Sequence, residues 1–516
     1  MARRGDRRAP VSVVGSRFGN RRFASGLACT LVAGGLICPR GLPAQAVRIT
    51  GTTSLQAVDI RPLVEDSVPI GLATGSGPYR LLADGRLVRC IDGEAFCRFR
   101  RSGSRATTMP AMQDLQATAW GFGEGISVHA HLRARGSMSG EDFAWPRADD
   151  RFDALAAWVE LDRERFRARL GRQWASNGLG LYNFDGASLT WRGSPFSLEG
   201  FGGWSLVAGL NEPPTGGALG AIDDLPPDTR GYLMGARASA RLGTGRALAA
   251  VYQRVLRTDR AGLYSERVAI DGVARAFGAT VDASYTHDLA GAQLNEARLR
   301  VSRELPARFA ATLDLRRHRP FFESWTIWGV FSPVAFDEAR GTLGWRSADG
   351  QWSADASGAR RRYDETNAGL QSTPLRTDGW RAGLGGEWSP DARWLVHGDY
   401  NVDIGFGASR SDVVTGVRWT PSERASLGAN LNALQNIYEF RVGTGRVFGV
   451  GLDGSLRLTR ESRLVVDGAL YSHRPSHNAP STDWSQRRVA IRLEWTVGSD
   501  PGQEAQAQRG RGEGPR

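Results

Sequence analysis

The chain of 516 residues contains no lysine, so all 66 of its basic residues are arginine. A Walker-type phosphate loop, a Schiff-base lysine, a kinase-type lysine and a serine–lysine nucleophile pair each require an ammonium group. The sequence therefore excludes these classes of enzyme.

Long apolar runs and helical periodicity are also lacking. Hydrophobic residues make up 41% of the chain and its mean hydropathy is −0.34, whereas Gly (65) and Trp (16) are abundant. Almost no segment repeats its apolar residues with the 3.6-residue period of a helix. A helical or α/β enzyme is disfavoured.

Cysteine is scarce, and two of the four cysteines lie in an N-terminal segment that looks like a targeting signal. Residues 1–46 combine an arginine-rich start, an apolar stretch over 23–38 and the small-x-small site Ala44-Gln45-Ala46. This order predicts a signal peptide cleaved after Ala46. The apolar stretch is too short, and too interrupted by glycine, for the roughly 20 residues of a membrane-spanning helix.

Removing that segment also changes the charge balance. It holds eight arginines and one aspartate, so its loss takes seven charges from the formal net charge of +12 and leaves +5. The remaining arginines are spread along the chain rather than gathered in a basic patch, and we expect no nucleic-acid partner.

The two other cysteines, Cys90 and Cys97, flank a turn-forming Asp92-Gly93. In an oxidising compartment this spacing predicts a disulfide that closes a hairpin. Residues 47–110 around it differ from the rest of the chain, with short apolar runs between Gly and Pro. We expect a small β-rich domain there, either periplasmic or plug-like at the mouth of a larger structure.

From residue 111 to 497, apolar and polar residues alternate in segments of about ten. Ala297, Leu299 and Val301, for example, alternate with Arg298 and Arg300. In hydrocarbon every backbone amide must be paired, which strands achieve only in a closed barrel, and roughly 9 to 11 tilted residues suffice to cross. The pattern predicts a transmembrane β-barrel, followed by a disordered tail over 498–516.

Short and long connections alternate along this region, as they do in an antiparallel up-and-down barrel. The short set includes 161–165, 243–246 and 459–463, and the long set includes 319–336. Twenty candidate strands can be counted, and 16 or 18 are also compatible with the pattern. The expected fold is all-β, a barrel of about 18 strands (16 to 20) with a small N-terminal β-rich domain.

The polar face of the strands carries many arginines and several carboxylates. We expect the following residues to line the pore: Arg165, Arg167, Arg169, Arg172, Arg237, Arg241, Arg298, Arg300, Arg316, Asp314, Asp399, Asp403, Arg457 and Arg492. Rings of guanidinium groups concentrate anions and grip carboxylates. Alternatively, these arginines pair with carboxylates on neighbouring strands and stiffen the wall. The sequence favours neither interpretation.

Three other motifs do not point to a single structure or function. The aromatic-rich loop over 319–336 fits either a constriction in the lumen or an interfacial girdle. The pattern Gly449–Gly454 matches a dinucleotide-binding motif but lies inside an alternating segment instead of opening a helix. His129 and His131 share a strand face without the context of a zinc enzyme, so no catalytic residue, metal site or cofactor is expected.

The segment Gly171-Arg172-Gln173-Trp174, followed by residues 184–189 (FDGASL), resembles the alginate-export type of outer-membrane barrel and related porins. The resemblance implies an 18-stranded barrel with a basic lumen that conducts an anionic polysaccharide or similar solute. It also implies that Arg172 and Asp185 lie near the pore. The segment 47–110 and the tail depart from that family's pattern.

The resulting hypothesis is a porin-like channel of the bacterial outer membrane that passes small, anionic or sugar-like solutes by diffusion and is not an enzyme. Its expected partners are outer-membrane lipid, the barrel assembly machinery and the solute itself. Two alternatives stay open: a barrel-borne lipid or peptide hydrolase that uses a histidine, and a barrel that only anchors the 47–110 segment as a binding module.

Overall fold

The structure is a computed structural model that describes residues 46–498, apart from 61–62, 78, 84–86, 92, 140–150, 207–230, 258–261, 320–334, 365–376, 406–407, 440–444 and 476–483. The expected signal peptide up to residue 45, nearly all of the aromatic loop and the tail after Gly498 lie outside the described residues. Within the described residues, no helix is both long and apolar enough to span a membrane.

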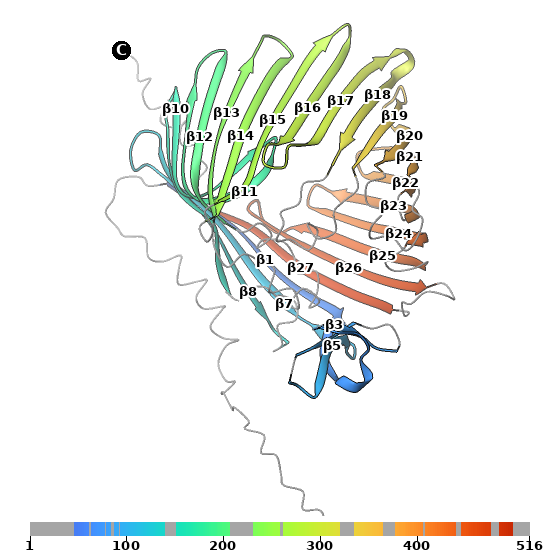
Figure 1. Cartoon of the computed structure of the whole chain (residues 1–516). Coiled ribbons are helices and arrows are strands. Elements are labelled where there is room, and N and C mark those ends of the chain that lie inside the picture. Colours follow the sequence, from blue (N-terminus) through green and yellow to red (C-terminus); the bar gives the residue numbers. More distant parts are fainter. Residues whose placement is uncertain are drawn as a thin grey trace, which may run out of the picture. The chain divides into compact units, whose positions relative to one another are not determined.

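One large antiparallel sheet closes on itself (Figure 1). Closure joins the last strand to the first, with Gly51 opposite Trp495, while β1 pairs with β7 on its other side. The strands of this wall are β1 (Ala46–Ile60), β6 (Ala106–Thr108), β7 (Pro110–Trp120), β8 (Ile126–Ser137), β9 (Phe152–Asp162), β10 (Phe166–Asn177), β11 (Gly180–Arg192), β12 (Phe196–Ser205), β13 (Gly231–Arg241), β14 (Arg246–Arg257), β15 (Gly262–Ala276), β16 (Ala279–Asp288), β17 (Gln293–Leu305), β18 (Phe309–His318), β19 (Phe336–Arg346), β20 (Trp352–Tyr363), β21 (Asp378–Trp388), β22 (Trp394–Gly405), β23 (Ala408–Ser422), β24 (Ala425–Glu439), β25 (Gly445–Arg457), β26 (Ser462–Pro475) and β27 (Trp484–Gly498).

The barrel has 22 strands, because β6 and β7 both pair with β1 and count as one wall strand. The expectation of about 18 strands, and the range of 16 to 20, is therefore wrong. One missed strand is β1, whose residues the sequence assigned to the small domain. The alternation of polar and apolar residues predicted the closed all-β barrel correctly, but not the number of its strands.

Residues 63–102 form a second sheet, inserted between two strands that pair with each other. Its strands are β2 (Leu63–Pro69), β3 (Tyr79–Leu81), β4 (Leu87–Cys90) and β5 (Phe96–Ser102), with the 3₁₀ turn η1 (Ile70–Leu72). The insertion leaves β1 at Ile60 and returns in β6 at Ala106, and these two residues are register partners. An N-terminal domain over 47–110 is thus replaced by an insertion into the barrel wall.

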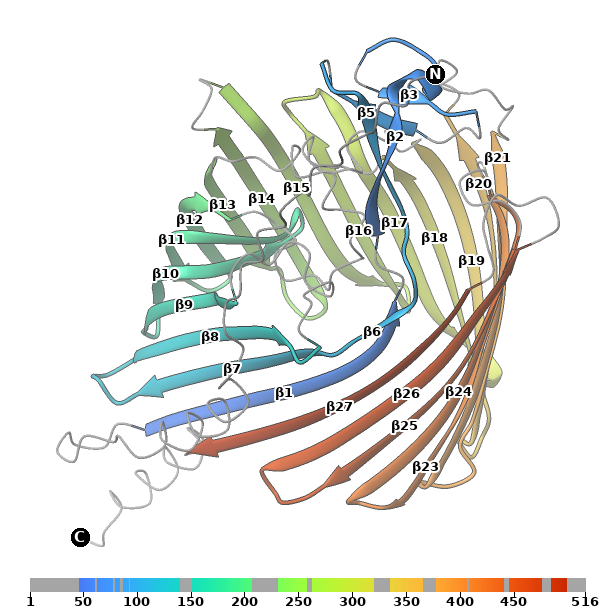
Figure 2. The ribbon, with the colours of Figure 1, turned by 90° about the horizontal axis from the view of Figure 1, so that it is seen from below.

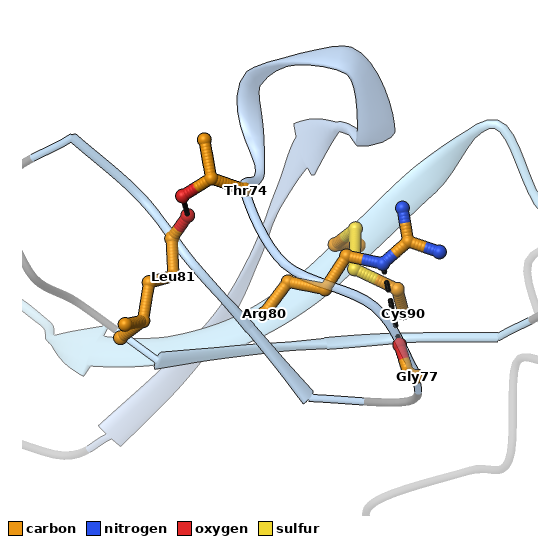
Figure 3. Close-up of a disulfide and its surroundings, with 6 residues drawn as sticks. Thr74, Gly77, Arg80, Leu81 and Cys90 are labelled. Atoms are coloured by element: carbon orange, nitrogen blue, oxygen red, sulfur yellow. Dashed lines mark hydrogen bonds between the residues drawn. A yellow bond between two sulfur atoms is a disulfide. The ribbon is translucent and has the colours of Figure 1, made fainter.

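A disulfide joins Cys90 to Cys97 across β4 and β5 (Figure 3). Both cysteines belong to a small buried cluster with Val88. Nearby, the Thr74 hydroxyl donates to the Leu81 carbonyl at 3.0 Å. Since the sheet is small, this cross-link adds stability that its apolar core alone would not supply.

The insertion starts at the rim of the long connections. The short turns between β9 and β10, β13 and β14, and β25 and β26 lie together at the other rim, where Ala46 pairs with Trp120. Short turns of outer-membrane barrels face the periplasm. By that rule the insertion starts and ends on the outer side, which differs from the expected periplasmic position, whereas the plug-like alternative stays a prediction.

One face of the wall carries large exposed apolar side chains, including Leu170, Leu384 and Leu452. Tryptophans gather on this face near the short turns, where Trp352 stacks on Trp388 and Trp394 on Trp419 at centroid distances of 5.4 and 5.8 Å. An apolar band edged by aromatic residues is the surface that a barrel presents to lipid.

Candidate functional site

A row of three glycines crosses β10, β11 and β12. Gly171 is the register partner of Gly186, which is in turn the partner of Gly203. Gly171 has a φ of +128°, and a Cβ on Gly186 or Gly203 would overlap the backbone of the neighbouring strand. The three strands approach each other here more closely than any side chain permits, and this lets them bend together.

Beyond this row the β10–β11 hairpin leaves the wall. β10 pairs with β9 only as far as Arg172, opposite Ala157, so the first residues of β9 have no register partner on β10. Side chains of the hairpin cover that open edge. Arg172 donates to the Ala154 carbonyl at 2.7 Å, and Asn183 donates to the Leu155 carbonyl at 3.0 Å. These bonds satisfy carbonyls that a strand would otherwise pair.

The tip of the hairpin reaches past β12 and β13 to the inner face of β14 and β15 (Figure 2). Leu179 packs with Val251 and Ala269. These two residues are register partners and face the lumen, because the next residue along β15, Ile270, is exposed on the lipid face. Tyr182 accepts a hydrogen bond from Arg267, whose guanidinium lies 5.7 Å from the centre of the tyrosine ring. The hairpin tip, defined here as residues 175–182, therefore narrows the lumen.

The Arg172–Asp185 pair explains why the hairpin folds inward. Arg172 donates to both carboxylate oxygens of Asp185, at 2.7 and 2.9 Å. The strand alternation gives Arg172 the same side as Leu170, which is 68% exposed on the lipid face. In a flat wall both charges would face hydrocarbon, at a cost of roughly 2–4 kcal/mol for an arginine near the midplane. Folding the hairpin inward removes them from lipid.

A groove of about 620 Å³, which we call the arginine groove, lies beside the tip on β13 to β17. Its charged lining residues are Arg237, Arg241, Arg298, Arg300, Asp271 and Asp282. Four positive against two negative charges leave a net charge of two positive. Gly178 of the tip lies against the Asp271 carboxylate, and Arg237 is the register partner of Val251, on which Leu179 packs.

The register places most of the arginines and carboxylates that the sequence singled out on the face opposite the exposed apolar side chains. Arg165 is an exception, because it lies in the turn between β9 and β10. Arg172 and Asp185 lie at the hairpin bend, close to the narrowed lumen. The others on that face are Arg167, Arg169, Arg237, Arg241, Arg298, Arg300, Asp314, Arg316, Asp399, Asp403, Arg457 and Arg492.

About half of these arginines pair with carboxylates of the wall. The recorded pairs are Arg167–Asp162 at 2.7 Å, Arg169–Glu160 at 2.5 Å, Arg298–Asp314, Arg316–Glu296 at 3.1 Å and Arg492–Glu494 at 3.0 Å. For Arg237, Arg241, Arg300 and Arg457, no ion pair is recorded within the described part of the chain. The pairing interpretation thus holds for the first subset, and anion binding stays a prediction for the second.

The histidines have structural neighbours. His129 stacks on Trp158 with ring centroids 4.9 Å apart, and its ring nitrogens lie 2.8 Å from the Ser127 hydroxyl and 3.2 Å from that of Thr118. A serine beside a histidine is one part of a hydrolytic site. However, a threonine hydroxyl stands where a carboxylate would stabilise the imidazolium. Among the described residues, no three His, Cys, Asp or Glu side chains gather as a metal site.

Sequence reasoning missed the hairpin tip, although signals for it exist. Glycines are conspicuous at Gly171, Gly186 and the Gly202-Gly203 pair, but only the register shows that three of them align. The short connection between β10 and β11 also lies on the rim of long loops.

The closed antiparallel wall with its apolar outer face is the architecture of a porin-like bacterial outer-membrane β-barrel. Among solved structures, the chain is similar to OccAB2 of Acinetobacter baumannii (TM-score 0.41, 10% identity, 89% of this chain and 99% of that one). It is also similar to the outer membrane protein OpdK of Pseudomonas aeruginosa (TM-score 0.40, 9% identity, 88% and 99%) and to the P pilus usher (PapC) translocation pore (TM-score 0.39, 10% identity, 87% and 99%).

Similarities of this degree carry no argument about what this chain does. No protein-family model and no curated protein matches it.

Proposed function

We propose that the mature chain, from Val47 onward, is an outer-membrane channel that passes small anionic or sugar-like solutes by diffusion. Assembly by the barrel assembly machinery would place its apolar face in outer-membrane lipid. A barrel of 22 strands is wide enough that known examples carry a plug in the lumen. Here the hairpin tip narrows the lumen, and the solute passes beside it.

The observation that supports anion preference is the arginine groove next to the tip. Arg237, Arg241 and Arg300 line it without a recorded ion pair in the described residues, so their charge is not cancelled by a bonded carboxylate. Guanidinium groups in a narrow, low-dielectric passage attract anions and bind carboxylates or phosphates with two hydrogen bonds. Arg167, Arg169 and Arg298 contribute less, because each has a carboxylate partner.

Reversal potentials in planar bilayers under a salt gradient test this proposal. The intact protein should form discrete channels that prefer anions, and the triple variant Arg237→Gln, Arg241→Gln, Arg300→Gln should lose most of that preference. The control removes three arginines away from the groove: Arg418→Gln, Arg457→Gln and Arg488→Gln. Arg418 and Arg488 lie on the same face as Arg457, because they alternate with the exposed Trp419 and Val489. Equal reversal potentials for the two variants, or the absence of channels, would reject the proposal.

A further inference from the structure

A group of charged residues stands on the lipid-facing side of β18, β19 and β20, at the rim of the long connections. It comprises Arg317, Arg319, Arg360 and Arg362 with Asp337 and Asp364, and we call it the outer arginine cluster. Asp378, the register partner of Arg362, lies beside it on the same face, so four positive charges stand against three negative ones and the net charge is one positive. The solute channel does not use this cluster, because it lies on the opposite side of the wall.

The register fixes that placement. One row runs Ala297, Arg317, Asp337, Arg362 across four strands. The next row toward the middle of the strands runs Leu299, Leu315, Ala339, Arg360. Since both leucines are 41% exposed on the lipid face, Arg360 stands directly at the upper edge of the apolar band.

A groove of about 600 Å³ connects the two kinds of surface. Leu299 and Leu315 lie at one end, and Arg317, Arg360 and Arg362 lie at the other together with Asp337, which Arg317 binds. A molecule that fills it must be apolar where it meets the leucines and anionic where it meets the arginines. That is the chemistry of a lipid with a phosphorylated headgroup.

The three carboxylates do not fully neutralise the cluster. Arg317 binds two of them, at 3.1 Å from Asp337 and more closely to Asp364, and Asp378 stands opposite Arg362. The hydrogen bond from Arg317 holds the pKa of Asp364 below its ordinary value, and Arg319 and Arg362 lower this pKa further. Arg360 and Arg362 have no ion pair recorded among the described residues. They remain available to a ligand, and arginine binds phosphate with paired hydrogen bonds.

We propose that the outer arginine cluster binds the phosphate groups of a glycolipid of the outer leaflet, with the acyl chains lying along Leu299 and Leu315. The rim of the long connections faces outward in barrels of this kind, so the cluster lies at the depth of the outer-leaflet headgroups. Binding there would offset the cost of holding arginines at the edge of hydrocarbon.

Native mass spectrometry of the full mature protein in detergent tests this binding, with lipid A carrying both phosphates as the probe. The double variant Arg360→Gln, Arg362→Gln should weaken binding at least about tenfold, as expected when two charge-assisted contacts are lost. Arg303→Gln is the matched control: it removes an outward-facing arginine from β17 at the short-turn rim and should leave binding unchanged. Heat-modifiability on gels checks that each variant is folded.

Two further probes distinguish the possible ligands. Dephosphorylated lipid A should bind no better to the intact protein than to the double variant, and inorganic phosphate should compete only weakly. Full competition by inorganic phosphate would overturn the lipid assignment, as would equal binding to Arg303→Gln and the double variant. Channel conductance of the double variant should be normal, so the result does not depend on the proposed channel.

Discussion

At the scale of single residues, the side of the wall on which a charge falls decides its partner. Arg172 and Arg169 lie on the same strand and both bind carboxylates. Arg169 faces the lumen in the ordinary alternation, whereas Arg172 would face lipid in a flat wall. The Arg172–Asp185 pair is therefore tied to the bend of the hairpin, and Arg169–Glu160 is not.

A double-mutant cycle measures the coupling energy between Arg172 and Asp185. Arg172→Gln, Asp185→Asn and their combination should show a coupling of about 1 kcal/mol in the free energy of unfolding from lipid vesicles, because the bidentate pair is lost in either single variant. The Arg98–Glu65 pair of the inserted sheet, whose side chains are about half exposed, is the control and should show a coupling near zero. Equal couplings would contradict the special role of Arg172.

The register agrees with the sequence on the side of most strand arginines, but not on Arg165 and Arg172, and the sequence did not predict their ion-pair partners. Alternation alone assigned Arg298 and Arg300 to the polar face. It could not tell that Asp314 binds the first and not the second, because that depends on rotamers and on the register between β17 and β18. A pattern of period two carries no information about register.

At the scale of elements, the glycine row is what distinguishes β10, β11 and β12 from other wall strands. Backbone oxygens fill the space that a side chain on Gly186 or Gly203 would need. Gly200, three residues before Gly203 on β12, has open space around it. Close approach to a neighbouring backbone is thus a property of particular positions, which include Gly379 on β21 as well as the bend, and not of every glycine in this barrel.

Gly186→Ala should destabilise the bend by about 1–3 kcal/mol, the usual cost of forcing a methyl group into packed atoms. Gly200→Ala should change stability little. Urea unfolding followed by tryptophan fluorescence measures both, and limited proteolysis of the folded variants reports whether the β10–β11 hairpin has loosened. If Gly186→Ala were as stable and as resistant as Gly200→Ala, the strands would not need the glycine row.

The number of strands predicted from the sequence was too low because some connections on the outer rim are short. Several joints on the outer rim, such as those after β10 and β16, are only a few residues long, so counting long loops undercounts strands. The first strand was missed for another reason: β1 is separated from β6 by the inserted sheet, and local pattern cannot show that Ile60 and Ala106 are partners.

At the scale of the whole molecule, the number of strands and the folded hairpin belong together. A ring of 22 strands encloses more space than a porin-sized channel needs. The tip occupies part of that space by bending wall strands inward. Alternation predicted the closed barrel, but the narrowing depends on the cross-strand alignment of Gly171, Gly186 and Gly203 and on the Arg172–Asp185 pair, which alternation does not show.

Single-channel conductance of a chain without the hairpin tip is the most direct test. Residues 175–182 would be replaced by a two-residue Asn-Gly turn, which suits a tight antiparallel connection. The intact protein should give discrete channels, and the shortened protein should give channels of several-fold higher conductance with a larger solute size limit. Equal conductance of the two proteins would show that the hairpin does not narrow the path of the solute.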